Sequence, residues 1–277
     1  MVLKLGEFFG ETTIGQINGE RQRAYAVQRG SQSAARRELE LLSAAINHHI
    51  RDMVGGVQAR FRPVLPMASA PRQRWLTRDE AASLIWAAWR KREQRGGTES
   101  GRLTSRHIAR FILVGLYTGS RAGAICGAAL VPTIGRGYIN LATGQYRRLA
   151  YGKRETAKRQ PTIDLPPRLL AHIRRWHRLG IAKAAVVEED GKPVLRVSKG
   201  WPGVVEKAGL GTAIKEEKVL PHTLRHTAIS WYLRSGVAVD RVSDYCGVSA
   251  AIIKKVYGHH IPGWTTEIMA ASMRLGR

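Results

Sequence analysis

Two arginines in this sequence stand where a phosphate could be bound. Arg225 follows His222 by three residues, so both side chains lie on one face of a helix start, and a helix N-terminus is itself an anion site. His226 lies one residue further along and is expected to point elsewhere. Arg121 follows a Thr-Gly turn at residues 118–119 that would present it at a fixed place. Arginine suits this task because its planar fork matches two phosphate oxygens and keeps its charge.

A tyrosine could supply the attacking group. Tyr257 ends a predicted helix that Ser249 caps, and Gly258 lets the chain turn there. Its basic flank, which would favour a bound phosphate and a phenolate, consists of Lys254, Lys255, His259 and His260. Breaking a phosphodiester without a metal needs a nucleophile, charge neutralisation on the non-bridging oxygens and a proton for the leaving oxygen. Taken singly, each segment also fits a solvated helix end, a helix cap with an exposed arginine, or a packed surface tyrosine.

The charge balance favours nucleic acid as the partner. The 277-residue chain holds 45 Lys and Arg against 21 Asp and Glu, a net charge of +24 with a pI near 11.0, and such a charge favours a polyanion. An anionic membrane is disfavoured, because the charge is spread along the chain and no run of about eighteen apolar residues exists. The N-terminus has no signal-peptide pattern, and Cys126 and Cys246 have no metal spacing. A cytoplasmic protein with reduced thiols is therefore expected.

A proline-rich break divides the chain. Three prolines between residues 61 and 75 each fix φ and remove a backbone donor, which disfavours a helix there. The expected segments are a helical one over 1–62, a linker over 63–75 and a larger domain over 76–277. In the first segment, helical patterning, with an apolar stripe in the second helix, predicts helices over 20–29 and 31–53. These helices fit either a small helical pack or one wall of a DNA clamp.

The larger domain is predicted to be mainly α-helical with a small antiparallel sheet. A capping-box pattern at Thr77-Arg-Asp-Glu80 opens one helix, and Gly119 ends the next. Residues 93–103 are polar and Gly-rich, so a loop is expected there. The other expected elements are helices over 77–92, 105–117, 167–180 and 222–258 (broken at Gly236 and Gly247), β-prone runs over 138–141, 146–151 and 162–165, and turns at 142–145 and Asp190-Gly191.

Taken together and in this order, the segments resemble the tyrosine recombinase (phage integrase) family. Thr118-Gly-Ser-Arg121 resembles the family's first arginine box, His222-Thr-Leu-Arg225 its second, and Tyr257-Gly-His-His260 its nucleophile segment. The run at 74–80 is similar to the start of the catalytic domain, and the likeness spans residues 75–265. The resemblance implies a catalytic domain that is mainly α with a small antiparallel β-sheet. The helical segment before it would be a partial core-binding, DNA-binding domain that lacks one or two of the usual helices, and an arm-binding domain would be missing.

The resemblance also assigns roles. The implied catalytic residues are Tyr257, Arg121, Arg225, His222 and Lys158. Tyr257 would attack the scissile phosphate and form a 3′-phosphotyrosyl link, while the arginines and His222 hold the non-bridging oxygens. Lys158 would protonate the departing 5′-hydroxyl, with Lys153 as the alternative, although either also fits a solvated hairpin charge. The 5′-hydroxyl of a partner strand would then reverse the step, so neither a metal nor a nucleotide cofactor is implied. The residues assigned to DNA contact are Lys153, Arg154, His259 and His260.

The implied partners are double-stranded DNA with specific recombination sites, further copies in a homo-tetramer, and accessory DNA-bending or directionality factors, without a membrane. The implied setting is a mobile element, with the protein on the nucleoid in a bacterial cytoplasm. Two positions depart from the family pattern, because Ala124 replaces an acidic residue and Val248 replaces the third-box His. His259 and His260 are the candidates to compensate. These departures keep open a catalytically impaired, recombinase-like DNA-binding protein. A general basic nucleic-acid-binding or structural protein is the remaining alternative.

Overall fold

A computed structural model describes residues 2–53, 60–68, 73–156 and 158–261. The chain forms two compact units, Met1–Pro71 and Arg72–Arg277, called the N-terminal and C-terminal units below. The boundary between them falls inside the stretch that is expected to be a linker. Among the described residues, no helix is both long enough and apolar enough to cross a membrane.

The N-terminal unit is a small helical pack. Its elements are α1 (Val2–Phe9), the 3-10 helix η1 (Ile14–Gln16), α2 (Gly19–Arg29) and α3 (Gln32–Met53). The last two confirm the predicted helices, whereas α1 was not predicted. Phe9 and Tyr25 pack with their ring centroids 5.3 Å apart, and the Tyr25 hydroxyl donates to the buried Glu38 carboxylate at 2.7 Å. The aromatic contact therefore ties α1 to α2, and the hydrogen bond ties α2 to α3.

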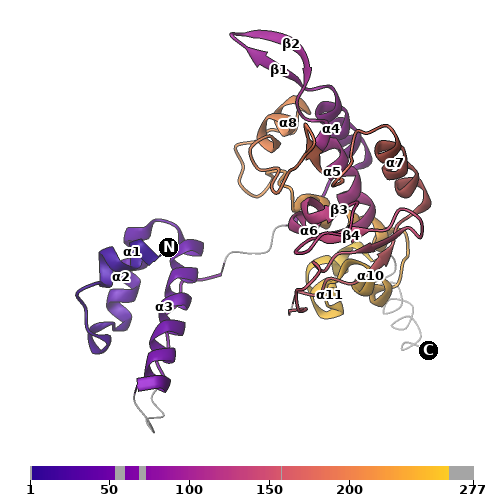
Figure 1. Cartoon of the computed structure of the whole chain (residues 1–277). Coiled ribbons are helices and arrows are strands. Elements are labelled where there is room, and N and C mark those ends of the chain that lie inside the picture. The colour runs from indigo at the N-terminus through magenta and orange to yellow at the C-terminus, as the bar shows by residue number, and fades with distance from the viewer. Residues whose placement is uncertain (1, 54–59, 69–72, 157, 262–277) are drawn as a thin grey trace, which may run out of the picture. The chain divides into compact units, whose positions relative to one another are not determined.

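The C-terminal unit is built around α5 (Arg106–Thr118), which packs against both α4 (Arg78–Arg90) and α9 (Thr223–Arg234) (Figure 1). Thr77 and Glu80 form the predicted capping box at the start of α4. Gly119 ends α5 in the left-handed region, at φ 57°, a conformation that glycine adopts without strain. The other helices are α6 (Ala122–Gly127), α7 (Pro167–Arg178), α8 (Trp201–Lys207), α10 (Val239–Cys246), α11 (Ala250–Tyr257) and the 3-10 helix η2 (Gly258–His260).

A four-stranded sheet lies beside these helices in the order β3-β4-β5-β6. Its strands are β3 (Ala128–Ala129), β4 (Gly137–Ile139), β5 (Gln145–Arg147) and β6 (Ile163–Asp164). The β4–β5 and β5–β6 pairs are antiparallel, as predicted, while the short β3–β4 pair is parallel. The predicted turn at 142–145 joins β4 to β5. A second predicted turn, at Asp190-Gly191, joins β7 (Glu188–Glu189) to β8 (Lys192–Pro193).

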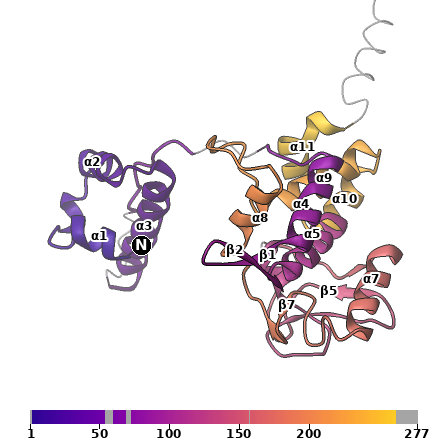
Figure 2. The ribbon, with the colours of Figure 1, turned by 90° about the horizontal axis from the view of Figure 1, so that it is seen from above.

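The prediction of a loop at 93–103 is wrong, because this stretch forms an antiparallel hairpin of β1 (Arg92–Arg95) and β2 (Thr98–Leu103). Gly96 and Gly97 both have positive φ, at 56° and 83°, as a tight hairpin turn requires. Figure 2 shows the hairpin projecting from the C-terminal unit. Ion pairs from Arg102 to Asp190 and from Lys207 to Glu99 connect β2 to the rest of the unit. β2 is exposed or half-buried along its whole length, so the alternation of apolar and polar residues that marks a half-buried strand is missing there.

Candidate active site

Arg225 is held in the first turn of α9 with only 4% of its surface exposed. Its Nη1 donates to the carbonyl oxygens of Gly119 at 2.7 Å and Cys246 at 2.8 Å. Its Nη2 donates to the Gly247 carbonyl at 3.1 Å. The guanidinium is therefore fixed by two separate turns of the chain, the Thr-Gly turn after α5 and the turn between α10 and α11.

Arg121 lies directly before α6 and reaches the same place. Its Nη1 donates to the Arg159 carbonyl at 2.7 Å, and its Nη2 donates to the Gly247 carbonyl at 3.2 Å. The Gly247 oxygen therefore accepts from both arginines, which brings the two guanidinium groups together. We call Arg121 and Arg225 the arginine pair.

The arginine pair carries excess positive charge. Burial and, next, the neighbouring Arg121 lower the pKa of Arg225 to about 10, and burial lowers the pKa of Arg121 as well. Both remain protonated at neutral pH. Among the described residues, no carboxylate forms an ion pair with either side chain. Two cations without an acidic counter-ion favour an anion between them, so the pair is suited to a phosphate.

Glycine is required at two positions that present this pair. Gly247 has φ 64°, and a Cβ there would lie 2.6 Å from the Arg159 carbonyl oxygen, which is too close. Gly119 has φ 57°, and a Cβ there would lie 2.8 Å from the Cys246 sulfur. The turns that carry two of the three carbonyl groups accepting from Arg225, those of Gly119 and Gly247, therefore need residues without side chains.

Tyr257 ends α11 and is buried. Ser249 caps this helix, as predicted, by accepting from the Ile252 N–H at 3.3 Å. The Tyr257 hydroxyl lies 2.7 Å from Nδ1 of His226. The expectation that His226 points elsewhere is therefore wrong: it is the residue that contacts the tyrosine. The sequence could not reveal this contact, because it joins residues that lie 31 positions apart.

The expectation that its surroundings favour a phenolate is also wrong. Burial raises the pKa of Tyr257 above its ordinary value, and only the positive charge of Arg225 opposes this effect. Lys254 and Lys255 are exposed on α11 and are not among the groups that shift this pKa. The phenol is neutral at neutral pH, so its proton needs an acceptor before the oxygen can act as a nucleophile.

His222 stands at the N-cap position of α9 and is exposed. Its ring packs edge-on against His226, with centroids 4.9 Å apart and an interplanar angle of 88°. The structure therefore brings together Arg121, Arg225, His222, His226 and Tyr257 from α6, the start of α9 and the end of α11.

The candidate lysines lie in the long connection between β5 and β6, residues 148–162. Lys153, Arg154 and Lys158 are all exposed there. Within the described residues, neither lysine ammonium makes a hydrogen bond or ion pair with the arginine pair or Tyr257. The connection is anchored one residue later, because the Arg159 carbonyl accepts from Arg121 and the Arg159 side chain pairs with Asp244 at 3.1 Å.

His259 and His260 lie in η2, two and three residues after Tyr257. Their rings lie 4.0 Å apart, and His260 packs edge-on against Trp75 at 5.4 Å. Burial, then His259 and Arg234, lower the pKa of His260 to about 4, so this imidazole is neutral at neutral pH. Val248, at the third-box position, is half-buried and packs on the apolar cluster of α9–α11. Ala124 contributes its carbonyl, which accepts from the Tyr146 hydroxyl at 2.7 Å.

Arg148 is a further buried arginine, which the sequence interpretation missed. Its Nη1 donates to the Tyr245 carbonyl at 2.6 Å and its Nη2 to the Thr118 carbonyl at 2.8 Å. It thus supports the turn that presents Arg121, and burial lowers its pKa. The alternation along β5 could have found it, because buried Tyr146 and Arg148 flank exposed Arg147.

The comparisons identify the class of fold. Neither a protein-family model nor a curated protein matches the sequence. The Tn1549 transposon integrase, solved with transposon right-end DNA, is 15% identical, with 100% of this chain and 91% of that chain covered and a TM-score of 0.68. A lambda integrase dimer bound to a COC′ core site is 14% identical, with 92% and 84% covered and a TM-score of 0.66. XerH recombinase bound to difH substrate in a pre-cleavage complex is 15% identical, with 93% and 74% covered and a TM-score of 0.58. The chain has the tyrosine recombinase fold.

Proposed function

We propose that this protein is a site-specific DNA recombinase that cleaves and rejoins DNA through a 3′-phosphotyrosyl link on Tyr257. One observation carries the proposal. Arg121 and Arg225 both donate to the Gly247 carbonyl, and the charge of Arg225 acts on the pKa of Tyr257, so the three side chains lie near one another. A phosphate bound by the pair would lie beside the phenol. The similar chains solved on DNA support the same kind of partner.

The chemistry follows from the contacts. His226 Nδ1 accepts the phenol proton as the Tyr257 oxygen attacks phosphorus, so the buried phenol does not have to ionise beforehand. Arg121 and Arg225 stabilise the charge that develops on the non-bridging oxygens, with His222 beside them. The bond from phosphorus to the 5′-oxygen breaks, and that oxygen takes a proton from Lys158, or from Lys153 as the alternative. In the second step the 5′-hydroxyl of a partner strand gives its proton to the neutral lysine as it attacks phosphorus. The bond from phosphorus to the Tyr257 oxygen breaks, His226 returns its proton to that oxygen, and the exchanged strand is closed.

The rest of the molecule fits this role. We propose that the N-terminal unit is a core-binding domain, and that Lys153, Arg154, His259 and His260 contact the DNA backbone. The charge of +24 suits a protein that spans many phosphates. Further elements of the proposal are a homo-tetramer on two duplexes, accessory DNA-bending or directionality factors, and an origin on a mobile element with the protein acting on DNA in the cytoplasm.

A second candidate function is a recombinase-like DNA-binding protein with impaired catalysis. Val248 and Ala124 favour it, because neither side chain can form the hydrogen bonds that the family's histidine and acidic residue would form. Arg121 is nevertheless held by two carbonyl groups, and it has no acidic partner among the residues that the structure describes. That positioning favours the active enzyme over the impaired one.

The test is covalent capture of DNA. The substrates are duplexes from the DNA flanking the gene. Each carries a nick near the cleavage site, so that the short fragment with the new 5′-hydroxyl diffuses away after cleavage. They are incubated with the protein, and the products are separated under denaturing conditions. Wild type should form a protein–DNA adduct and Tyr257→Phe should form none, although both bind the duplex equally, because only the hydroxyl is lost. Tyr232→Phe is the matched control, since its buried hydroxyl donates to a backbone carbonyl instead, and it should form the adduct. An adduct with Tyr257→Phe would refute the assignment of the nucleophile, and tight binding without any adduct would favour the impaired protein.

A further inference from the structure

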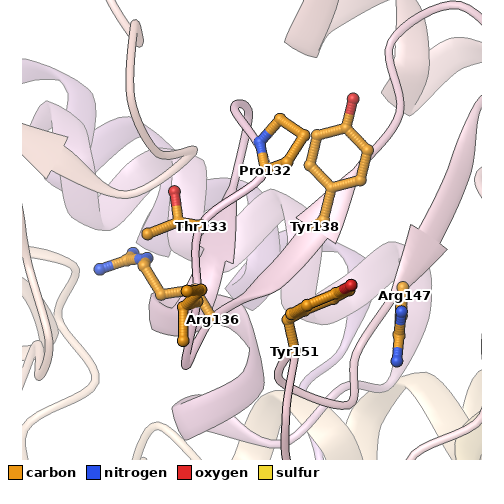
Figure 3. Close-up of a pocket in the computed structure, with 7 residues that line it drawn as sticks. Pro132, Thr133, Arg136, Tyr138, Arg147 and Tyr151 are labelled. Carbon is orange, nitrogen blue, oxygen red and sulfur yellow. The ribbon is translucent and has the colours of Figure 1, made fainter.

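A narrow cavity opens beside the β4–β5 strand pair, on a part of the C-terminal unit that the proposed chemistry does not use. It has a volume of about 230 Å³ and a mainly apolar lining. Figure 3 shows Tyr138 and Pro132 on one side of it, Tyr151 on the opposite side and Arg147 at one end. We call this cavity the tyrosine slot.

The slot is fixed by the backbone. The Gly135 N–H donates to the Tyr151 carbonyl at 3.1 Å, and the Tyr151 N–H donates to the Arg136 carbonyl at 3.0 Å. The Arg136 guanidinium donates to the Cys126 carbonyl at 2.9 Å. The Tyr151 ring is nevertheless 60% exposed. An exposed aromatic ring on an anchored backbone is a preorganised surface for a ligand.

The lining matches one kind of ligand. The Arg147 guanidinium lies 5.3 Å from the centroid of the Tyr151 ring, so a cation stands beside an exposed aromatic face. Aromatic rings stack on nucleobases of any sequence, and an adjacent arginine binds the phosphate of the same nucleotide. An apolar protein side chain would use the rings but would leave the arginine unpaired, and the charge of +24 favours an anionic ligand.

The slot shares its framework with the proposed active site. Arg147 lines the slot, while the next residue, Arg148, points inward and donates to the Thr118 carbonyl in the turn before Arg121. Tyr151 also stands near the start of the connection whose Arg159 carbonyl anchors Arg121. The slot and the proposed active site are therefore joined through consecutive residues, 147 and 148, and through one connection.

We infer that the tyrosine slot binds a nucleobase swung out of the DNA duplex next to the cleavage site, stacked on Tyr151 with its phosphate on Arg147. This inference rests on the proposed DNA-recombinase function. A base that is already unpaired costs least to swing out, so the protein should prefer DNA with an unpaired nucleotide to a fully paired duplex. The slot then contributes to the choice of site by reading DNA deformability instead of sequence.

The experiment compares two duplexes of one sequence, one fully paired and one with a single-nucleotide 2-aminopurine bulge, with binding measured on the full-length chain. Wild type should bind the bulged duplex more tightly and quench the 2-aminopurine fluorescence by stacking. Tyr151→Ala should lose roughly five- to 150-fold in affinity for the bulged duplex and retain its affinity for the paired one. Trp86→Ala is the matched control, because Trp86 is 54% exposed with Arg90 4.5 Å from its ring, and it should change neither affinity.

Three results would overturn the inference. The first is an equal effect, or none, of Tyr151→Ala on the two duplexes. The second is wild-type binding to the bulged duplex without quenching. The third is a Tyr151→Ala chain that differs from wild type in its mass in solution without DNA, because the slot would then be a contact between copies. If wild type forms the covalent adduct but binds the bulged and the paired duplex equally, only the inference about the slot is refuted. If the chain binds neither duplex, the proposed function is refuted as well.

Discussion

The arginine pair and the connection between β5 and β6 carry the two kinds of positive charge that the proposed reaction needs, and they are built in opposite ways. Arg225 is buried and donates to three carbonyl groups, whereas Lys153 and Lys158 are exposed. A charge that stabilises a transition state works best when it is in place beforehand. A proton donor only has to arrive with the substrate, so its side chain can stay in solvent until DNA is bound. Variants that separate folding from catalysis test this contrast.

Arg225→Ala should have the largest effect, because it removes both a charge and a structural tie. Cleavage of the nicked duplex should fall by roughly a hundred- to a thousandfold for the lost donor alone. The Gly247 carbonyl would keep its bond from Arg121, while the carbonyl groups of Gly119 and Cys246 would lose the bond from Arg225, at about 1–3 kcal/mol for each one that finds no new partner. Single-turnover cleavage and thermal melts would measure the two losses. A variant with normal cleavage and normal Tm would show that this guanidinium plays neither part.

Lys158→Ala and Lys153→Ala should separate catalysis from thermal stability. Because both side chains are exposed, neither change should alter Tm, while cleavage should fall by roughly a hundred- to ten-thousandfold for whichever lysine is the general acid. A substrate with sulfur in place of the bridging 5′-oxygen leaves without a proton, so it should restore cleavage in that variant. Arg225→Ala should gain nothing from sulfur. If sulfur rescues neither lysine variant, another group protonates the leaving oxygen.

Val248→His tests whether the arginine pair lacks a third hydrogen-bond donor to the bound phosphate. A third donor beside the phosphate should speed cleavage by up to about a hundredfold. Val248 packs on the apolar cluster of α9–α11, so the imidazole should also lower Tm. Val248→Asn serves as a control for polarity alone. A folded histidine variant that is no faster than wild type would show that His222 or His226 already fills this role.

The smallest expected effect concerns alkaline pH. Burial raises the pKa of Tyr257, and likewise that of Tyr232, so the folded state keeps these protons at a pH where the unfolded chain has lost them. The stability they contribute is complete below about pH 10 and falls as the pH rises above that value. Tm measured from about pH 8 to about pH 11 should therefore decline, and less steeply for Tyr257→Phe. An identical decline in the two proteins would mean that the phenol is not buried in solution.

Much of the fold could be predicted from local signals, and the site only in part. Gly119 and Gly247 mark helix ends, because only glycine takes their backbone conformation without strain, and Thr77 with Glu80 marks a helix start. The β1–β2 hairpin was missed, since β2 has no buried residue and the composition of the stretch is that of a loop. The contact from Tyr257 to His226 was missed for another reason. It depends on how α11 packs against α9, and helical spacing along α9 alone does not contain that information.

The carbonyl group of Gly247 has a consequence for how this protein can change by mutation. It accepts from both arginines, and only Val248 separates this residue from Ser249, which caps the helix that bears Tyr257. Any insertion or deletion in this turn would shift the tyrosine helix and both guanidinium anchors at once. Within the described part of the chain, the ion pairs of β2 go to Asp190 and Lys207 and not to the site, so the length and sequence of the hairpin can vary without moving the site. Inserted tags, reporters or new binding segments are therefore best placed at Gly96-Gly97, and the stretch 246–249 is best left unchanged.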